Sequence, residues 1–427
     1  MASGPLNGIR VLEFGQIIAG PLGCQLLSDL GAEVIKVEPT YGEPWRLNAQ
    51  FVPLESKSFH GLNHGKQSLA IDVTRREAQE AIHRLVPSVD VVVINYRPDV
   101  AQRLCIDYET LKSLRPDLIY VDSTAFGREG PMADRPGYDI VVQALSGLLA
   151  SDSKVDPRGA PQSAYPAVAD TTTGYAIATG VCAALFHRAT TGQGQRVETS
   201  LLINALTIQV GTGSRDFASI PAADGLRNRF MEMLADARGK GVSYTDLLAL
   251  RDQTFGASQP GNIYYRGFLT SDGAITVGAL SASLRAKVRA VLGVEHNRDD
   301  TGYDPNDPAQ QAVDAQVVAT VEAMIRQKSS AYWDQAFEAG GVPVSCVNFI
   351  HDLIDHPQVV ANGYVSAVSH DVTGAERLAA PPWKMSETPP QTQGASPPLG
   401  RDNDAILGSL GYQTHEIEKL RESGVIR

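Results

Sequence analysis

The chain has 427 residues, of which 43% are hydrophobic and 20% are charged. This is the composition of a globular protein, and it excludes disordered, collagen-like and coiled-coil chains. With 37 Lys and Arg against 48 Asp and Glu, the formal net charge is −11. Such an acidic net charge argues against a nucleic-acid-binding surface, but it is compatible with a local basic pocket for a phosphorylated cofactor. At about 100–200 residues per domain, the length predicts two or three domains.

The first residues, MASGPLNGIR, lack the basic and apolar regions of a signal peptide. No apolar run approaches the roughly 18 residues of a membrane span. The four cysteines show neither pairing nor metal-ligand spacing, which favours reduced thiols. We therefore expect a soluble cytoplasmic protein that binds neither nucleic acid nor membrane.

Short runs rich in Val and Ile alternate with helical patterns in the first part of the chain. Such runs, separated by helices, are typical of a parallel sheet that is covered on both faces. The predicted fold class is therefore α/β, with a doubly wound parallel sheet. Strands are expected at residues 8–14, 33–38, 90–95 and 118–122, and helices at residues 20–30 and 75–85.

Two long helices are predicted next, at about residues 171–188 and 198–210. A polar, mostly helical stretch then leads to an alternating pattern over residues 262–280 with Asp-Gly at its turn, which indicates a hairpin. A Pro-rich arm precedes a final helix at about residues 413–423. We expect a large α/β domain, a small α+β domain and a C-terminal segment that completes the large domain, at residues 1–211, 212–340 and 341–427.

Familiar catalytic signatures are missing from the sequence. There is no G-x-S-x-G elbow, no P-loop and no H-E-x-x-H motif. His351 and His356 lie on opposite sides of a short helical pattern, which does not predict a shared ligand. No metal site is expected.

Asp170 comes just before a long apolar helical pattern. As an N-cap, its carboxylate would accept a backbone N–H from two or three residues further on. As a nucleophile, it would be a carboxylate that the helix dipole keeps ionised. Its position alone is compatible with both interpretations.

Two further segments join a turn or a strand end to a helix start. Tyr138 and Asp139 follow a Pro-Gly turn, where Asp139 either complements the helix dipole or orients a neighbouring group. Asn95 and Arg97 follow a predicted strand, where open parallel sheets bind their ligands. They are placed either to meet an anion or to form a plain solvated loop.

Several short motifs occur in a characteristic order over nearly the whole chain. In this order and spacing they resemble the family III CoA transferases, the CaiB/BaiF group typified by formyl-CoA and carnitine CoA transferases. The motifs are PLNGIRVLEF at 5–14, AGP at 19–21, LGAEVIKVEP at 30–39, KQSLAID at 66–72, PGYD at 136–139, TGQGQRV at 191–197, PPLG at 397–400, LGY at 410–412 and GVI at 424–426.

The resemblance implies that Asp170 is the catalytic nucleophile and that a coenzyme A thioester is the substrate, with no permanently bound cofactor. Tyr138, Asp139 and a glycine-containing loop with Gly256, Gln259 and Gly261 would complete the active site, the loop acting as a lid. The resemblance places CoA against Ile18, Ala19, Ile71, Thr74, Asn95, Tyr96, Arg97, Ala101, Arg103 and Leu104.

The chain departs from the formyl-CoA transferases at several of these positions. Those enzymes carry glutamine at the position of Ile18, whereas here Gln16 lies nearby. Their CoA-holding basic residues correspond to Pro39 and Pro136, with Arg97 and Arg135 as candidates to compensate. Specificity for oxalate or formate is therefore not expected.

The implied reaction moves CoA from an acyl-CoA donor to a free carboxylic acid, through an aspartyl anhydride and an enzyme–CoA thioester at Asp170. Our expectation for the acids is a short dicarboxylic acid, with succinyl-CoA as the donor. The resemblance also implies an interlocked homodimer, with a heteromer containing a paralogous chain as the alternative.

Two alternative functions stay open. An α-methylacyl-CoA racemase resembles this chain around Asp170, but it needs a second acid/base group, which is histidine in a Gly-His-Asp motif. This sequence has Gly137-Tyr-Asp139 instead. A non-catalytic subunit of a heteromeric transferase is the other alternative, although such subunits usually lose the nucleophile that is retained here.

Overall fold

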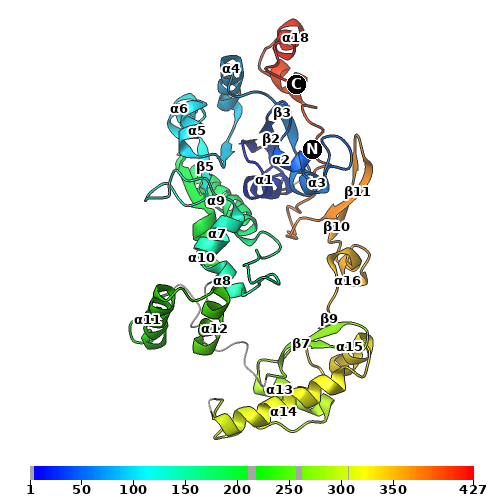
Figure 1. The fold of residues 1–427 in the computed structure, drawn as a ribbon. Coiled ribbons are helices and arrows are strands. Elements are labelled where there is room, and N and C mark those ends of the chain that lie inside the picture. Colours follow the sequence, from blue (N-terminus) through cyan, green and yellow to red (C-terminus); the bar gives the residue numbers. More distant parts are fainter. Residues whose placement is uncertain (1–3, 210–217, 256–261, 306) are drawn as a thin grey trace. The chain divides into compact units, whose positions relative to one another are not determined.

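The computed structural model describes residues 4–209, 218–255, 262–305 and 307–427 (Figure 1). The chain forms two compact units, which we describe separately. Unit 1 combines Met1–Ala223 with Gln358–Arg427, and unit 2 is Asp224–Pro357. The domain bounds expected from the sequence stay a prediction.

Unit 1 is built on a six-stranded sheet in which all strand pairs are parallel. The predicted α/β class with a doubly wound parallel sheet is thereby confirmed. The strand order is β3-β2-β1-β4-β5-β6, so the chain leaves β1 toward one edge and β4 toward the other. The strands are β1 Arg10–Glu13, β2 Glu33–Glu38, β3 Gln67–Ala70, β4 Val91–Ile94, β5 Ile119–Thr124 and β6 Arg196–Ser200.

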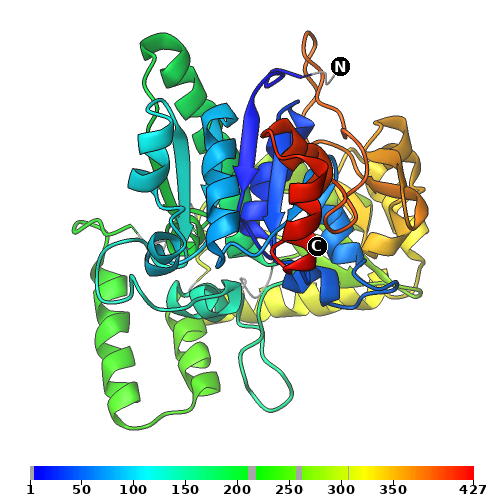
Figure 2. The same ribbon diagram turned by 90° about the horizontal axis from the view of Figure 1, so that it is seen from above.

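Helices cover both faces of this sheet (Figures 1 and 2). Apolar residues of α1 and α9 pack on one face, around Leu27 and Ile177. Those of α4, α5, α6, α17 and α18 pack on the other face, around Ile82 and Leu407. The helices of unit 1 are α1 Ala19–Asp29, α2 Pro44–Leu47, α3 Lys57–Asn63, α4 Arg76–Leu85, α5 Pro98–Arg103, α6 Tyr108–Leu114, α7 Asp139–Leu145, α8 Leu148–Asp152, α9 Val168–Thr191, α10 Leu201–Thr207, α16 Pro357–Ala361, α17 Asn403–Ser409 and α18 Thr414–Glu422, with the 3-10 turn η1 Val86–Ser88.

The four predicted strands and the helices near 20–30 and 75–85 are confirmed, whereas β3 and β6 were not expected. The predicted helix at 198–210 is wrong at its start, because β6 continues to Ser200 and α10 begins at Leu201. The side chains of β6 are partly or fully exposed up to Thr199, since this edge strand pairs only with β5. An exposed edge strand therefore lacks the continuous apolar run that marks the inner strands.

The C-terminal segment returns to the sheet of unit 1 and binds the edge strand β3. The carboxylate of Asp402 accepts the N–H of Ser68 at 2.8 Å. The amide of Asn403 accepts the N–H of Ala70 at 2.8 Å and donates to the Ala70 carbonyl at 3.3 Å. These side chains satisfy backbone groups that an edge strand would otherwise leave unpaired. The final helix expected near 413–423 is confirmed as α18.

Unit 2 has its own apolar core around Phe268, Val288 and Phe337. The predicted hairpin is confirmed, because β7 and β8 pair in antiparallel register, and β9 joins β8 on its other side. Outside the units' cores, β10 and β11 form a two-stranded sheet in unit 1. The remaining elements are α11 Gly225–Gly239, α12 Tyr244–Phe255, β7 Tyr265–Leu269, β8 Ala274–Gly278, α13 Ala282–Leu292, α14 Pro308–Ile325, α15 Ser330–Ala339, β9 Val344–Cys346, the 3-10 turn η3 Ile350–Asp352, β10 Val365–His370 and β11 Gly374–Ala379.

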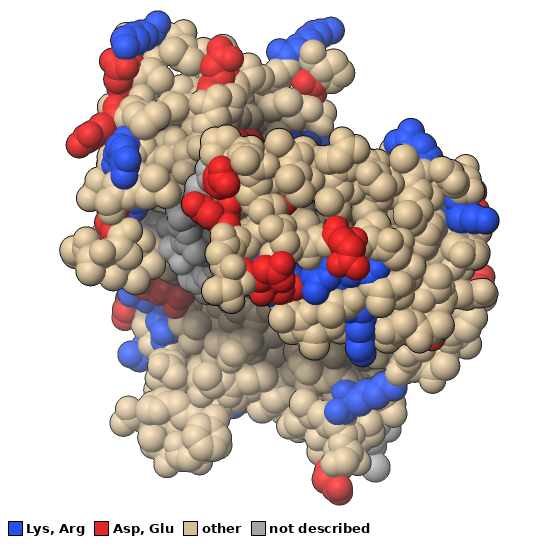
Figure 3. All heavy atoms as spheres, turned by 90° about the horizontal axis from the view of Figure 1, so that it is seen from below, with Lys and Arg blue, Asp and Glu red and all other residues tan. Residues whose placement is uncertain are grey.

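Charged side chains of both signs are interspersed on the face shown in Figure 3, so the negative net charge is not gathered into one acidic patch there. None of the helices in the described part of the chain combines the length and apolar character that a membrane crossing requires.

Candidate active site

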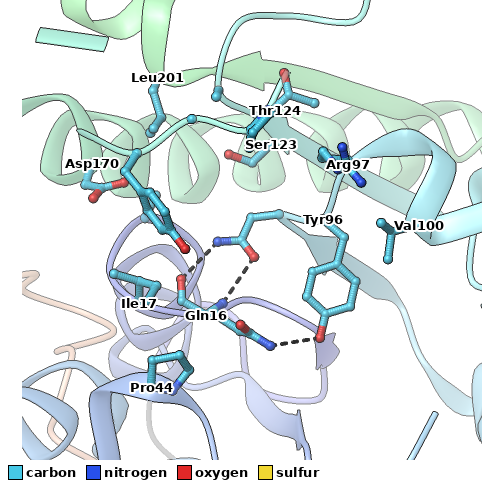
Figure 4. Close-up of a pocket in the computed structure, with 16 residues that line it drawn as sticks. Gln16, Ile17, Pro44, Tyr96, Arg97, Val100, Ser123, Thr124, Asp170 and Leu201 are labelled. Atoms are coloured by element: carbon cyan, nitrogen blue, oxygen red, sulfur yellow. Dashed lines mark hydrogen bonds between the residues drawn. The ribbon is translucent and has the colours of Figure 1, made fainter. Parts of the chain in front are cut away.

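A pocket of about 310 Å³ opens at the carboxyl ends of β1, β4 and β5 in unit 1. The chain leaves β1 and β4 in opposite directions here, and open α/β sheets bind ligands at such a switch point. We call it the Asp170 pocket. Its lining residues are Gln16, Ile17, Ala19, Pro44, Asn95, Tyr96, Arg97, Val100, Ser123, Thr124, Ala125, Pro136, Gly137, Tyr138, Asp170 and Leu201 (Figure 4).

A second pocket of about 360 Å³, the Arg103 pocket, adjoins the first. Tyr96 and Val100 line both pockets, so a ligand that extends from one pocket into the other would contact these two residues. In Figure 4, Asp170 and Ile17 lie at one end of the Asp170 pocket and Tyr96 and Val100 at the other. The Arg103 pocket is lined by Val73, Thr74, Tyr96, Val100, Arg103 and Leu104.

The two pockets bring together most residues expected to contact CoA. Ala19, Asn95, Tyr96 and Arg97 line the Asp170 pocket, and Thr74, Tyr96, Arg103 and Leu104 line the Arg103 pocket. Three expected residues line neither pocket. Ile18 precedes α1 as its N-cap residue, and Ile71 and Ala101 are buried in the sheet's core. The expected loop residues Gly256, Gln259 and Gly261 lie outside the described residues.

Asp170 is the third residue of α9, and the N-cap position belongs to Ala167. The N-cap interpretation of Asp170 is therefore wrong. Burial and, to a smaller extent, the nearby Asp139 carboxylate together raise the pKa of Asp170 from 3.8 to about 7. No hydrogen bond to the Asp170 carboxylate is found among the described residues. The result is a basic carboxylate that lines the pocket and has no hydrogen-bond partner in the part of the chain that the structure describes.

Asp139 supplies the capping contact that Asp170 does not. Its Oδ1 accepts the backbone N–H groups of Ala169 at 2.9 Å and of Asp170 at 3.1 Å. Its Oδ2 accepts from Gln143, whose own Oε1 accepts the N–H of Ala164 at 3.0 Å. Asp139 thus lies in the first turn of α7 and also orients the residue that carries the candidate nucleophile.

The remaining pocket residues include some that the sequence did not single out, such as Ser123 and Thr124 at the end of β5 and Pro44 at the start of α2. The signal that could have found the first two is their place directly at a strand's carboxyl end. Tyr138, which was expected, lines the pocket and is 66% exposed. Gln16 also lines it, and its Nε2 donates to the Tyr96 hydroxyl at 3.2 Å (Figure 4).

One cluster in unit 1 has the donor types of a metal site. Ligand atoms of Glu55, His60 and His370 lie within 4.8 Å of one another. However, Nδ1 of His370 accepts the N–H groups of Val372 at 3.1 Å and Thr373 at 3.2 Å, so Nε2 carries the ring proton. A protonated Nε2 cannot ligate a cation, so the donor set does not fit a metal.

Comparison with known proteins identifies the family. The family model for CoA-transferase family III matches residues 6–403. The chain is 31% identical to the succinate–glutarate CoA-transferase of Agrobacterium fabrum, over 95% of this chain and 96% of that one. It is 28% identical to the formyl-CoA:oxalate CoA-transferase of Rhodopseudomonas palustris, over 99% of this chain and 97% of that one.

A crystal structure of a CaiB/BaiF family protein from Brucella suis superposes with a TM-score of 0.73 at 29% identity, covering 96% of this chain and 100% of that one. The match therefore extends through both units and the C-terminal return. With a family model that spans nearly the whole sequence, the chain is an enzyme that belongs to CoA-transferase family III.

Proposed function

We propose that Asp170 is the nucleophile of a CoA transfer that proceeds through covalent intermediates on its carboxylate. The observation that carries this proposal is a carboxylate that no described residue hydrogen-bonds, with its pKa raised to about 7, in a pocket that adjoins the Arg103 pocket. A more basic carboxylate attacks a carbonyl more readily, and above pH 7 most of it is ionised.

In the first step, an Asp170 oxygen attacks the acyl-CoA thioester carbonyl, and the C–S bond breaks to give an aspartyl–acyl anhydride and CoA thiolate. The thiolate then attacks the aspartyl carbonyl, which yields an enzyme thioester and the first free acid. The incoming carboxylate attacks this thioester and releases the thiolate, and thiolate attack on the new acyl group frees Asp170. Each step conserves the acyl activation that hydrolysis would dissipate.

The proposed CoA path runs from Asp170 past Tyr96 and Val100 to Arg103. Those two residues line both pockets, which supports a single extended ligand. Arg103 would meet phosphate at the far end, because a guanidinium forms charge-assisted hydrogen bonds with phosphate oxygens.

For the acceptor, we favour a short dicarboxylic acid, with succinyl-CoA as donor. Relatives at 30–31% identity bear the names succinate–glutarate and succinyl-CoA:glutarate CoA-transferase. Arg97 is the one Lys or Arg among the described residues that line the Asp170 pocket, which supports a role for it in holding a second carboxylate. Mass spectrometry of CoA products from succinyl-CoA with glutarate, oxalate and formate tests this, and product with formate or oxalate alone would refute it.

Trapping with hydroxylamine tests the nucleophile. Incubation with acyl-CoA and hydroxylamine should inactivate the enzyme and leave a hydroxamate on the Asp170 peptide, because the anhydride and the enzyme thioester both expose that carbonyl. A racemase would instead exchange the substrate α-proton with D₂O and leave Asp170 unmodified. None of the described residues that line the pocket is the histidine such a route needs, so negligible exchange is expected.

The interlocked homodimer implied by the resemblance remains our proposal for the quaternary state. The cytoplasm, expected from the composition and the cysteines, remains our proposal for the compartment. Light scattering on the purified chain distinguishes a homodimer from a subunit that requires a paralogous partner. Activity of the chain alone would exclude the role of a non-catalytic subunit.

A further inference from the structure

The turn that joins β1 to α1 contains an unusual backbone conformation. Ile17 has a φ of 71°, in the left-handed region that β-branched residues rarely occupy. Such a conformation persists only where its surroundings hold it, and it is commonly found at functional sites. Both Gln16 and Ile17 line the Asp170 pocket, so the shape of this turn is part of the pocket wall (Figure 4).

Two buried or half-buried side chains hold the turn from different elements. Asn95, which follows β4, accepts the Gln16 N–H at 3.1 Å and donates to the Gln16 carbonyl at 2.9 Å. Glu43, which precedes α2, accepts the Ile17 N–H with Oε2 at 2.8 Å. The contact from Glu43 falls on the residue with the left-handed conformation itself.

The Glu43 carboxylate is in turn fixed by Lys36, whose Nζ lies 3.1 Å from Glu43 Oε1. The same Nζ donates to the Gly15 carbonyl at 2.8 Å and to Glu13 Oε1 at 3.2 Å. The side chains of Lys36, Glu13 and Glu43 are at most 1% exposed. Lys36 therefore fixes the turn at the Gly15 carbonyl, and Glu43 fixes it two residues later at the Ile17 N–H.

This arrangement is a poor source of fold stability. Burying an ion pair costs desolvation, and apolar side chains of similar volume generally serve a core as well or better. A charged pair does fix the orientation of the backbone, because the carboxylate and the ammonium form charge-assisted hydrogen bonds with the peptide groups next to them. Glu43 bonds the backbone of Ile17, which lines the Asp170 pocket, and this contact points to a role in the reaction.

We propose that Glu43 is a positioning residue for acyl transfer, which holds Ile17 in its left-handed conformation and thereby sets the pocket wall beside Asp170. The inference rests on the proposed role of Asp170 as nucleophile. Small displacements of a pocket wall matter because the thioester carbonyl must meet the nucleophile at near-attack geometry, and a misplacement of about 1 Å costs on the order of 100-fold in rate.

A double-mutant cycle tests the proposal. Glu43→Gln keeps an acceptor for the Ile17 N–H but loses the charge that Lys36 binds, while Lys36 retains Glu13. We expect kcat to fall about 30-fold and KM for the acyl-CoA to change less than about threefold, because alignment and not binding is lost. Glycine adopts positive φ without strain, so in the Ile17→Gly background the same Glu43→Gln change should cost less than about fivefold. If Glu43→Gln lowered kcat by the same factor in the wild-type and in the Ile17→Gly background, the proposal would be overturned.

Asp29→Asn is the matched control, since Asp29 is a buried carboxylate paired with His64 at 2.9 Å that does not line the pocket. It should leave kcat within about twofold. If Glu43→Gln does not fold, as judged by circular dichroism, Glu43→Asp replaces it, because the shorter side chain keeps the charge but withdraws the carboxylate from Ile17. A kcat of Glu43→Asp equal to wild type would overturn the proposal.

The rate of hydroxamate formation on Asp170 separates this inference from the proposed function. Hydroxamate labelling of Asp170 in the wild-type enzyme, together with slower labelling in the Glu43 variant, supports both the nucleophile and the role of Glu43. Equal labelling rates in the two proteins would refute the role of Glu43 alone. A wild-type enzyme that turns over without any label on Asp170 would refute the nucleophile, and the inference about Glu43 with it.

Discussion

Two carboxylates of unit 1, the buried Glu38 and the half-buried Asp170, are held in opposite ways. Glu38, at the end of β2, accepts two hydrogen bonds from Arg46, at 2.7 and 2.9 Å, and one from Ser68 at 2.9 Å. Burial alone would raise the pKa of Glu38, but Arg46 more than offsets it and lowers the pKa below its ordinary value. Asp170 has no such partner among the described residues, and its pKa is raised to about 7.

The difference separates a carboxylate that holds the fold from one that is available for chemistry. A satisfied carboxylate has its lone pairs engaged and is a weak nucleophile. An unpartnered one remains basic, at the expense of folding stability. The same contrast divides the arginines. Arg46 is buried against Glu38 and the Phe59 ring, whereas Arg103 lines its pocket without a carboxylate partner among the described residues.

The largest effect is expected for Asp170→Asn, which should lower kcat by about 10⁴-fold or more, since the acyl acceptor is lost. The variant should also be more stable at pH 8. A carboxyl whose pKa is 3.8 unfolded and about 7 folded loses stability as pH rises from about 4 to 7, and asparagine does not. We expect a gain of about 2 kcal/mol in the free energy of unfolding, measured with urea. A substantial residual kcat of Asp170→Asn, or a free energy of unfolding below that of the wild type, would contradict the contrast drawn between Asp170 and Glu38.

Glu38→Gln should do the reverse and destabilise the fold by about 3 kcal/mol, because it leaves the Arg46 charge buried without its main partner. The control is Glu33→Gln, which removes an exposed partner of Arg10 and should cost less than about 0.5 kcal/mol. Urea unfolding at pH 8 measures both. Equal costs for the two variants would show that removing Glu38 does not leave an uncompensated buried charge on Arg46.

Arg103→Ala should raise KM for acyl-CoA about tenfold and leave kcat within about twofold. A phosphate contact made equally in the ground and transition states contributes to binding alone. Arg76→Ala also removes one exposed positive charge, but Arg76 pairs with Glu80 and lines neither pocket, so steady-state constants should not change. A fall in kcat with unchanged KM would contradict the role of Arg103.

Asp139→Asn should produce the smallest effect, a shift of the pH profile. Removing the negative charge beside Asp170 lowers the pKa of Asp170 below about 7, while the asparagine oxygen still accepts the two backbone N–H groups. The rate of Asp170 labelling, relative to its plateau, should then rise a few-fold at pH 6. A profile that moves to higher pH would exclude electrostatic coupling between the two carboxylates.

Much of the fold could be predicted from local sequence. The strands β1, β2, β4 and β5 contain adjacent apolar residues that are buried on both faces of the sheet, and such burial leaves a short apolar run in the sequence. That signal is missing in β6, where residues 196–199 alternate between exposed and half-buried, so the local pattern predicts the start of a helix where the structure has a strand. Asp170 was correctly placed at a helix start, but the group that caps this helix is Asp139, 31 residues earlier in the chain.

The sequence by itself determined the α/β class, the family and the residues around which the site is built, because these depend on periodicity and on motifs that survive in order along the chain. Only the tertiary structure decided how the carboxylates differ. Asp170, Glu38 and Glu43 are alike as residue types, and their behaviour follows from burial and from partners supplied by distant elements. The left-handed conformation of Ile17 is decided in the same way, since local propensity opposes it and only contacts from outside the turn can hold it.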